Sequence, residues 1–312
     1  MKALLINKYG GPEVLTLGEI PAPVAESGKI LVQIKFAGIN PVDFKIRKGM
    51  VFFLSGFKFP KILGGDIAGI VENQPEGSPY KSGDRVFAML NFKGGGYAGY
   101  AAIPSEWLCK IPENVGFRDA AALPLAGLTA LQSLKELGKI RTGVKVLING
   151  ASGGVGHLAV QIAKWYGAEV TAVCSGKNKD WVLSLGADNV VDYTEKDPME
   201  LTEQFDIVFD AVAKLPVLKA GKLLKEQGVY ISTMPLPLIF IRQLLNVFSG
   251  KKFYAIMAKP SGKDLELLSN MMAGNALMPF VERVYALSQG KEAHQYIESE
   301  RVRGKLVFDL NL

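Results

Sequence analysis

The chain has 312 residues, of which 48% are hydrophobic and 21% are charged, and its formal net charge is +6. This length and composition are normal for a globular protein with two domains. Cys109 and Cys174 are the only cysteines and form no CxxC or Cys/His pattern, so no disulfide framework or metal site is expected. The basic residues are dispersed along the chain, and we expect no nucleic-acid partner.

The chain begins with an apolar run that is too short for a signal peptide and continues directly into a strand pattern. No stretch of 18 or more uninterrupted apolar residues follows, which predicts a cytoplasmic protein without an integral membrane segment. The first third predicts β structure punctuated by glycines, with strands near residue 3, at 30–36, from 66 and from 85.

The pattern changes near residue 119. A helical stretch at 120–137 is followed by strands that alternate with helices, which predicts a doubly wound parallel sheet. The expected strands are 144–149, 169–174, 189–192, 205–210 and 229–232, and the expected helices start at 155 or span 180–185 and 215–224.

A glycine-rich turn lies directly between the first of these strands and the helix that follows it. Ala151, Gly153 and Gly156 occupy the three positions of a G-x-G-x-x-G fingerprint, with alanine in the first. Gly153 would let the backbone approach a pyrophosphate, and Gly156 would let the helix pack closely against the strand. The N–H groups of the first helical turn would face the phosphates. This context predicts a dinucleotide site; the alternative is an ordinary tight turn.

The end of the second strand indicates which dinucleotide is bound. A site that prefers NAD would carry Asp or Glu there for the ribose hydroxyls, but the chain has Ser175, Lys177 and Lys179. A hydroxyl and two ammonium groups suit a 2′-phosphate through charge-assisted hydrogen bonds. NADP(H) is therefore favoured over the alternative of a solvated basic turn.

One segment near the end of this region, 235–248, is unusually apolar and is followed by Lys251 and Lys252. A buried helix, a subunit contact and peripheral contact with a membrane are the alternatives for it. The remaining tail predicts a helix from 264, a strand at 279–287, a helix at 292–300 and a strand from 305. We expect this tail to return to the β-rich part, so the domains are predicted as 1–119 with 263–312, and 120–262.

Nine segments in order along the chain resemble the medium-chain dehydrogenase/reductase superfamily, specifically its zinc-free quinone oxidoreductase-like branch. They are YGGPEVL from Tyr9, AGINPVDFKIRKG from Ala37, LGGDIAGIV from Leu63, GDRVFA from Gly83, GGGYAGYAAIP from Gly94, LPLAGLTALQSL from Leu123, GASGGVG from Gly150, SLGADNVVDY from Ser184 and KPSGKDL from Lys259. The resemblance implies a Rossmann NADP(H)-binding domain inserted into a GroES-like substrate and catalytic domain, in a protein that is usually a homodimer.

The resemblance also bears on metals. Zinc-dependent relatives have a Cys ligand near the position of Asn40 and a His-Glu pair where this chain has Gly65 and Asp66, so we expect no zinc. His157 and His294 lie in predicted helices without ligand-spaced partners and are expected to be structural or surface residues. The implied chemistry is direct transfer of a hydride from NADPH to a quinone or to the β-carbon of an enone or enal.

The resemblance further implies the site residues. Asn40 and Asp43 would lie near the nicotinamide as positioning residues, although the amide of Asn40 could also simply cap its own turn. Thr129 would approach the carboxamide, Tyr193 would pack near the 2′-phosphate, and Ala211 with Val212 would border the ring. The complete set implied for the cofactor is Thr129, Ser152, Gly153, Gly154, Val155, Gly156, Ser175, Lys177, Lys179, Tyr193, Ala211 and Val212.

The chain departs from enoyl-thioester reductases of the same scaffold, which place a tyrosine proton donor shortly after the segment that ends at Gly49. Here Met50, Val51, Phe52 and Phe53 follow, and no proton donor is identified. Met50, Phe52 and Phe53 are predicted to form an apolar wall or lid of the substrate pocket. An enoyl-thioester reductase and a noncatalytic NADPH-binding or membrane-peripheral protein stay open as alternatives.

Overall fold

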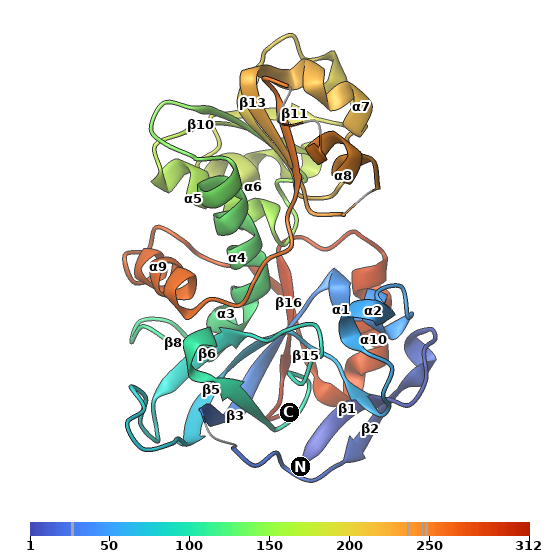
Figure 1. Ribbon diagram of the computed structural model, residues 1–312, viewed down its shortest axis with the longest axis vertical. Helices are drawn as coiled ribbons and strands as arrows, with labels where there is room; N and C mark the ends of the chain where they lie inside the picture. The colour runs from blue at the N-terminus through green and yellow to red at the C-terminus, as the bar shows by residue number, and fades with distance from the viewer. Residues whose placement is uncertain (26–27, 236, 245, 247–248) are drawn as a thin grey trace. The chain divides into compact units, whose positions relative to one another are not determined.

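A computed structural model describes residues 1–25, 28–235, 237–244, 246 and 249–312. The chain forms two compact units: unit 1 is Met1–Leu128 with Lys259–Leu312, and unit 2 is Thr129–Ala258 (Figure 1). We expected borders at 119/120 and 262/263. The first border lies instead within a helix, α4 (Pro124–Leu131), which continues past the change in sequence pattern.

Unit 2 contains a six-stranded sheet in which every neighbouring pair of strands is parallel. Its strands are β9 (Lys145–Asn149), β10 (Glu169–Cys174), β11 (Asn189–Asp192), β12 (Phe205–Asp210), β13 (Leu224–Ser232) and β14 (Lys252–Ala255). The spatial order is β11-β10-β9-β12-β13-β14, which is the doubly wound 3-2-1-4-5-6 order. The direction of winding reverses between β9 and β12, and this is where such sheets bind ligands, at the carboxyl ends of their strands.

Helices cover both faces of this sheet. In Figure 1, α5 (Gly156–Trp165) and α6 (Lys179–Ser184) lie on one side, and α7 (Val217–Ala220) and α8 (Pro237–Leu244) lie on the other. The prediction of a helix over 215–224 is wrong in length: α7 ends at Ala220, and β13 begins at Leu224, five residues before the expected start. Leu224 is fully buried and pairs with Phe205, so the sheet rather than the local pattern decides its conformation.

The helical stretch expected at 120–137 is divided into α3 (Phe117–Ala122), α4 and a π-helical turn at Gln132–Leu137. The first break precedes Pro124, which has no N–H to continue the hydrogen bonding of α3 and begins α4 instead.

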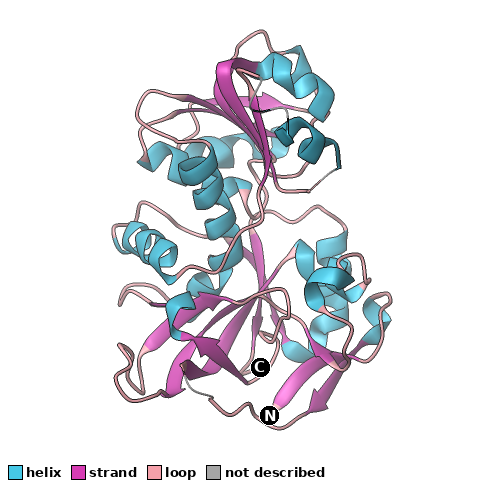
Figure 2. Ribbon diagram, in the orientation of Figure 1, coloured by secondary structure: helices cyan, strands magenta, loops and turns pink. Residues whose placement is uncertain are grey.

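Unit 1 is rich in β structure, as the strands in Figure 2 show. A seven-stranded sheet has the order β15-β16-β3-β5-β6-β8 with β7 also paired to β3, and a three-stranded sheet has the order β2-β1-β4. The strands are β1 (Lys2–Ile6), β2 (Leu15–Glu19), β3 (Lys29–Ile39), β4 (Lys61–Ile62), β5 (Asp66–Asn73), β6 (Arg85–Met89), β7 (Tyr100–Pro104), β8 (Leu108–Lys110), β15 (Val281–Ala286) and β16 (Lys305–Asp309). The helices besides α3 are α1 (Pro41–Arg47), α2 (Phe52–Ser55), α9 (Gly262–Ala273) and α10 (Gly290–Glu298).

The C-terminal strand β16 determines the centre of unit 1. It pairs antiparallel with β3, with Leu306 opposite Ile39, while β5 pairs with the other edge of β3 and places Asp66 opposite Gly38. Three segments from the beginning, the first third and the end of the chain therefore meet beside residue 40.

The apolar segment 235–248 contains α8, and its residues Leu236, Leu245, Val247 and Phe248 lie outside the described residues. Within α8, Ile239 is fully buried, whereas Ile241 is 57% exposed and Leu244 is 77% exposed. No helix in the described part of the chain is long and apolar enough to cross a bilayer.

Candidate functional site

The glycine-rich turn of unit 2 has two glycines with different surroundings. A Cβ on Gly156 would lie 2.1 Å from the carbonyl oxygen of Gly150, so only glycine lets α5 approach β9 this closely. A Cβ on Gly153 would make one tight contact, 3.3 Å from the carbonyl oxygen of Gly150, and would have no other neighbour within 4 Å, so the backbone is open on its other sides. The turn is therefore closed toward the protein at Gly156 and open at Gly153, as a bound pyrophosphate requires.

Other residues implied for the cofactor in unit 2 lie directly after the carboxyl ends of neighbouring strands. Val212 follows β12 and packs over the turn, because a Cβ on Gly150 would lie 2.5 Å from its Cγ1. Ala211 donates its N–H to the carbonyl oxygen of Asn149 at 3.1 Å. Tyr193 follows β11, donates its N–H to Cys174 O at 3.1 Å and is 57% exposed. The structure thus brings together the ends of β9, β10, β11 and β12.

The loop after β10 contains the residues expected to bind the 2′-phosphate. Ser175 precedes a 3-10 turn at Gly176–Asn178, and the side chains of Lys177 and Lys179 are exposed. Thr129, by contrast, is buried in α4 at the beginning of unit 2.

We expected no carboxylate at this loop, and the structure corrects this expectation. Asp192 is opposite Cys174 in the pairing of β10 with β11, and a Cβ on Gly176 would lie 2.2 Å from its Oδ2. Asp192 Oδ1 accepts bonds from the N–H and hydroxyl of Thr194 at 2.9 and 2.7 Å. These bonds lower the pKa of Asp192, with smaller contributions from the Gly176 N–H and Lys179. The carboxylate is ionised and holds two loops together.

Unit 1 contains a buried polar network around the other two predicted residues. Asn40 ends β3 and caps α1: its backbone N–H donates to Asp43 Oδ2 at 2.7 Å, and the side chains complete a capping box. Asn40 Nδ2 donates to Asp66 Oδ2 at 2.8 Å, and its Oδ1 accepts from Lys305 Nζ. Lys305 also lies 3.4 Å from Asp66 Oδ2. The Asn40 amide thus has one fixed orientation.

Sequence reasoning identified no role for Lys305, Asp66 or Tyr97 in this network. Asp66 is 26 residues and Lys305 is 265 residues from Asn40, and no local pattern marks Lys305 as buried. Tyr97 is fully buried and donates its hydroxyl proton to Asp43 Oδ2 at 2.7 Å. Only the segments resembling the family, which include Asp66 and Tyr97, gave any indication of them.

Burial dominates the electrostatics of this network. It raises the pKa of Asp43 to about 7, although the hydrogen bonds from Tyr97 and from the Asn40 N–H oppose the rise. Burial also raises the pKa of Asp66, opposed chiefly by Lys305 and Asn40. The pKa of Tyr97 is raised well above its usual range by burial and by Asp43, so its phenol stays protonated.

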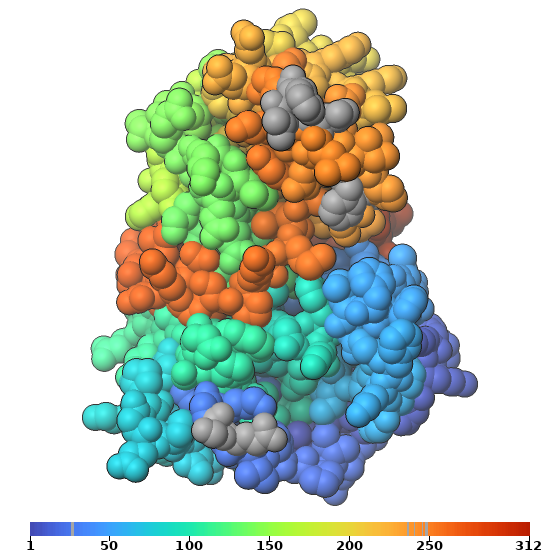
Figure 3. Space-filling view, in the orientation of Figure 1, coloured from blue at the N-terminus to red at the C-terminus, as the bar shows by residue number. Residues whose placement is uncertain are grey.

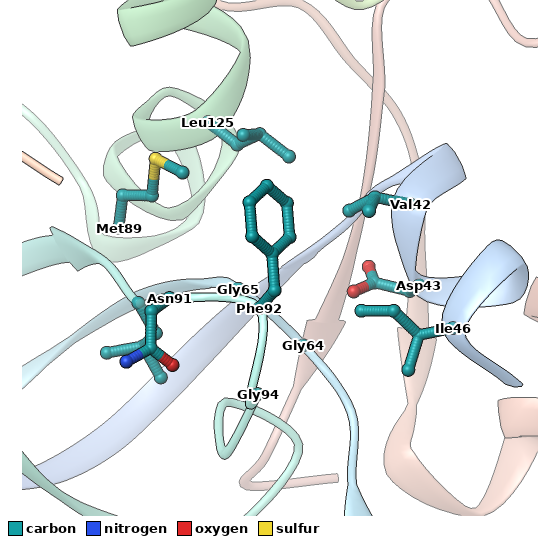
Figure 4. A pocket seen from close by; sticks show the side chains of 11 residues that line it. Val42, Asp43, Ile46, Gly64, Gly65, Met89, Asn91, Phe92, Gly94 and Leu125 are labelled. Atoms are coloured by element: carbon teal, nitrogen blue, oxygen red, sulfur yellow. The ribbon is translucent and has the colours of Figure 1, made fainter. Parts of the chain in front are cut away.

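A small pocket lies beside Asp43 within unit 1, with room for little more than one water molecule. Figure 4 shows the carboxyl group of Asp43 and the ring of Phe92 pointing into the same space, with Leu125 and Met89 on the opposite side. Val42, Ile46 and Leu90 add further apolar surface, and Asn91 adds an amide. The pocket is therefore small and mostly apolar, with one carboxyl group in its lining.

The predicted apolar wall lies elsewhere on unit 1. Met50, Phe52 and Phe53 are 59%, 41% and 66% exposed and do not line this pocket. This part of the chain, near residue 50, is at the surface in Figure 3, where it is light blue. Phe52 packs against Phe53 and Phe57, with ring centroids 5.9 and 5.2 Å apart. The role of these three side chains in substrate binding stays a prediction.

The two histidines are both buried, so neither is a surface residue. His157 Nδ1 lies 2.9 Å from the carbonyl oxygen of Gly153 and supports the glycine-rich turn. Burial lowers the pKa of His294 to about 3, which keeps it neutral. Among the residues that the structure describes, no three His, Cys, Asp or Glu side chains are grouped to hold a metal ion.

Comparison with known proteins shows the class of this chain. Residues 26–113 match the alcohol dehydrogenase GroES-like domain, and residues 185–308 match the zinc-binding dehydrogenase family. The chloroplast envelope quinone oxidoreductase homolog of Arabidopsis thaliana is 34% identical, and the match covers 99% of this chain and 98% of that protein. The chain therefore belongs to the medium-chain dehydrogenase/reductase superfamily, whose members are oxidoreductases that use pyridine nucleotides.

Two further relatives define the branch. The chloroplastic NADPH-dependent alkenal/one oxidoreductase of Arabidopsis thaliana is 32% identical, over 98% of this chain and 79% of that protein. Escherichia coli quinone oxidoreductase, solved in complex with NADPH, matches with a TM-score of 0.85 and 26% identity over 99% of this chain and 100% of that one. The chain is a member of the zinc-free quinone oxidoreductase-like branch, and the predicted family and fold class are confirmed.

Proposed function

We propose that this protein is an NADPH-dependent reductase of quinones and α,β-unsaturated carbonyl compounds. The observation that supports it most is the glycine-rich turn at the switch point of the parallel sheet, closed at Gly156 and open at Gly153. The relatives include proteins named as quinone oxidoreductases and an NADPH-dependent alkenal/one oxidoreductase. When bound, NADPH would supply a hydride.

We propose that unit 2 is the NADP(H)-binding domain and unit 1 the substrate domain. Ser152, Gly154 and Val155 would bind the pyrophosphate through backbone N–H groups at the start of α5. Gly153, whose own N–H donates to the carbonyl oxygen of Gly150 at 3.0 Å, would let the backbone approach the pyrophosphate. Ser175, Lys177, Lys179 and Tyr193 would surround the 2′-phosphate, and Thr129, Ala211 and Val212 would contact the nicotinamide. In unit 1, Asn40 and Asp43 would position the substrate. Met50, Phe52 and Phe53, which do not line the pocket beside Asp43, would form an apolar wall or lid outside it.

A panel of acceptors tests the function. Purified protein should accelerate NADPH oxidation with at least one member of a set of quinones, 2-alkenals and vinyl ketones. No acceleration with any of them would overturn the proposal. Crotonyl-CoA belongs in the same panel, because an enoyl-thioester reductase would prefer it over the free enals.

Cofactor choice is a separate prediction. The double substitution Lys177→Ala/Lys179→Ala should raise the KM for NADPH by roughly 10- to 100-fold and leave that for NADH nearly unchanged, because only NADPH has a 2′-phosphate for these charges. Steady-state kinetics with both cofactors measures this. Lys219→Ala/Lys222→Ala, two exposed lysines in α7 and in the turn that follows it, is the matched control and should change neither value. Equal losses with NADPH and NADH would exclude the assignment of Lys177 and Lys179.

A noncatalytic, membrane-peripheral role is the second candidate, because Ile241 and Leu244 on α8 expose apolar surface. Tight NADPH binding without turnover, and liposome binding that is lost in Leu244→Glu, would favour it.

We also propose a homodimer, since β14 forms an edge of the parallel sheet that a second copy could cover. The cytoplasmic location stays a prediction; several relatives are named as chloroplastic or mitochondrial proteins.

A further inference from the structure

The proposed reaction needs a proton as well as a hydride. A hydride adds to the β-carbon of an enone with its electron pair, and the π electrons of the C=C bond move toward the carbonyl oxygen. The saturated product forms only when a proton binds the α-carbon or the oxygen; a quinone likewise needs a proton to become a hydroquinone. No tyrosine is present at residues 50–53, where enoyl-thioester reductases carry their donor, so another group must supply this proton.

The pocket in unit 1 offers one candidate. Of the 11 residues that line it, Asp43 is the only one with an ionisable side chain. The hydrogen bonds that its carboxyl group accepts, from the Asn40 N–H and the Tyr97 hydroxyl, both end on Oδ2. Figure 4 shows the same carboxyl group directed into the pocket. Asp43 therefore lies on the first turn of α1 with one oxygen anchored and its carboxyl group directed into the pocket.

The surroundings keep this carboxyl group protonated to a large extent near neutral pH. Asp43 is 1% exposed, and burial raises its pKa to about 7. The charged groups that face it are Asp66, which raises this pKa, and Lys305, which lowers it; the hydrogen bonds from Tyr97 and Asn40 lower it as well. An acid with a pKa close to the working pH is the most effective proton donor.

We propose that Asp43 is the general acid of the reaction, an inference that rests on the proposed function. The carboxyl O–H bond breaks as the new C–H or O–H bond of the product forms, and the carboxylate is left behind. After the product leaves, water entering the pocket returns a proton to Asp43. Hydride and proton together account for the two electrons and two hydrogens that the substrate gains.

Asp43→Asn tests the proposal with little change in shape, because the amide oxygen can still accept the hydrogen bonds that now end on Oδ2. With an α-methyl-substituted enone, kcat should fall at least 100-fold. Wild-type protein should also protonate the α-carbon on one face, and the variant should give both α-epimers. The face of hydride addition, followed with deuterated NADPH, should stay the same. A purely structural role as a helix cap would not change the facial selectivity of protonation.

The pH dependence gives a second, independent measurement. Because the protonated form acts, kcat of the wild type should fall as the pH rises through about 7. Tyr97→Phe removes a hydrogen bond that lowers the pKa of Asp43, so this fall should shift to higher pH. Tyr97→Phe keeps the aromatic ring, whose centroid lies 4.8 Å from that of Phe308. This variant therefore tests the proposal even if Asp43→Asn does not fold.

Titration of the cofactor-free protein supplies a readout that does not depend on turnover. The ¹³C resonance of the Asp43 carboxyl, identified by its loss in Asp43→Asn, should titrate near pH 7; titration near 4 overturns the proposal. Unchanged kcat and facial selectivity in Asp43→Asn, or an unshifted profile in Tyr97→Phe, overturn it as well and leave the proposed function intact. A wild type that reduces no acceptor overturns the proposed function and this inference together.

Discussion

Gly156→Ala should destabilise the protein by about 3 kcal/mol and abolish measurable NADPH binding. A methyl group there would lie 2.1 Å from the carbonyl oxygen of Gly150 and 2.7 Å from the Cα of Ala151, so α5 must move away from β9. Both contacts are with backbone, which cannot relieve the clash by changing a rotamer, and the cost belongs at the upper end of that for overpacking. Urea denaturation and a fluorescence titration with NADPH measure the two effects.

Gly153→Ala is the informative partner of this variant, because it separates cofactor binding from folding. Its new methyl group would be 3.3 Å from its nearest neighbour, so stability should change by less than about 1 kcal/mol. NADPH binding should still weaken at least tenfold, since the methyl group enters the space expected for the pyrophosphate. Gly116→Ala, where a Cβ meets nothing within 4 Å, is the control and should change neither property. Normal NADPH binding by Gly153→Ala would exclude this turn as the pyrophosphate site.

Lys305→Met should lower the free energy of unfolding by about 3 to 5 kcal/mol. Lys305 and Asp66 are 3% and 0% exposed, and removing the ammonium group leaves a buried carboxylate without its counter-charge. The loss should be smaller at acidic pH, because Asp66, whose pKa burial already raises, then binds a proton. Asn40 would also lose the donor that fixes its amide oxygen, so kcat should fall with stability. Urea denaturation at two pH values, with kinetics, measures both changes.

An exposed ion pair in the same unit provides the comparison. Lys110 lies 2.8 Å from Asp84, but its side chain is 56% exposed, and Lys110→Met should cost less than about 1 kcal/mol. Asp66→Asn combined with Lys305→Met should cost less than the two single changes added together, because the double variant leaves no unpaired charge. A loss below 1 kcal/mol in Lys305→Met would show that the buried pair does not stabilise unit 1.

The parallel strands and the glycine-rich turn could be predicted because their signals are local. A short apolar run between glycines defines β9, and the spacing of Ala151, Gly153 and Gly156 follows from the geometry of one strand, one turn and one helix. The same reasoning gave β10, β11 and β12 with their observed bounds. It was less successful at α7 and β13, where the partner strand decides at which residue the helix ends and the strand begins.

The remaining features of the site depend on strand pairing between distant segments and on burial, and neither could be predicted from local sequence. Asp192 reaches the Ser175 loop only because β10 and β11 are parallel neighbours, and the sequence of that loop contains no trace of it. Lys305 meets Asn40 and Asp66 only because β16 pairs with β3. Asp43 was expected from resemblance alone, and its raised pKa comes from its burial in the folded protein. Composition and spacing determine local backbone structure, whereas proton affinity depends on what surrounds a side chain, and this the folded protein alone provides.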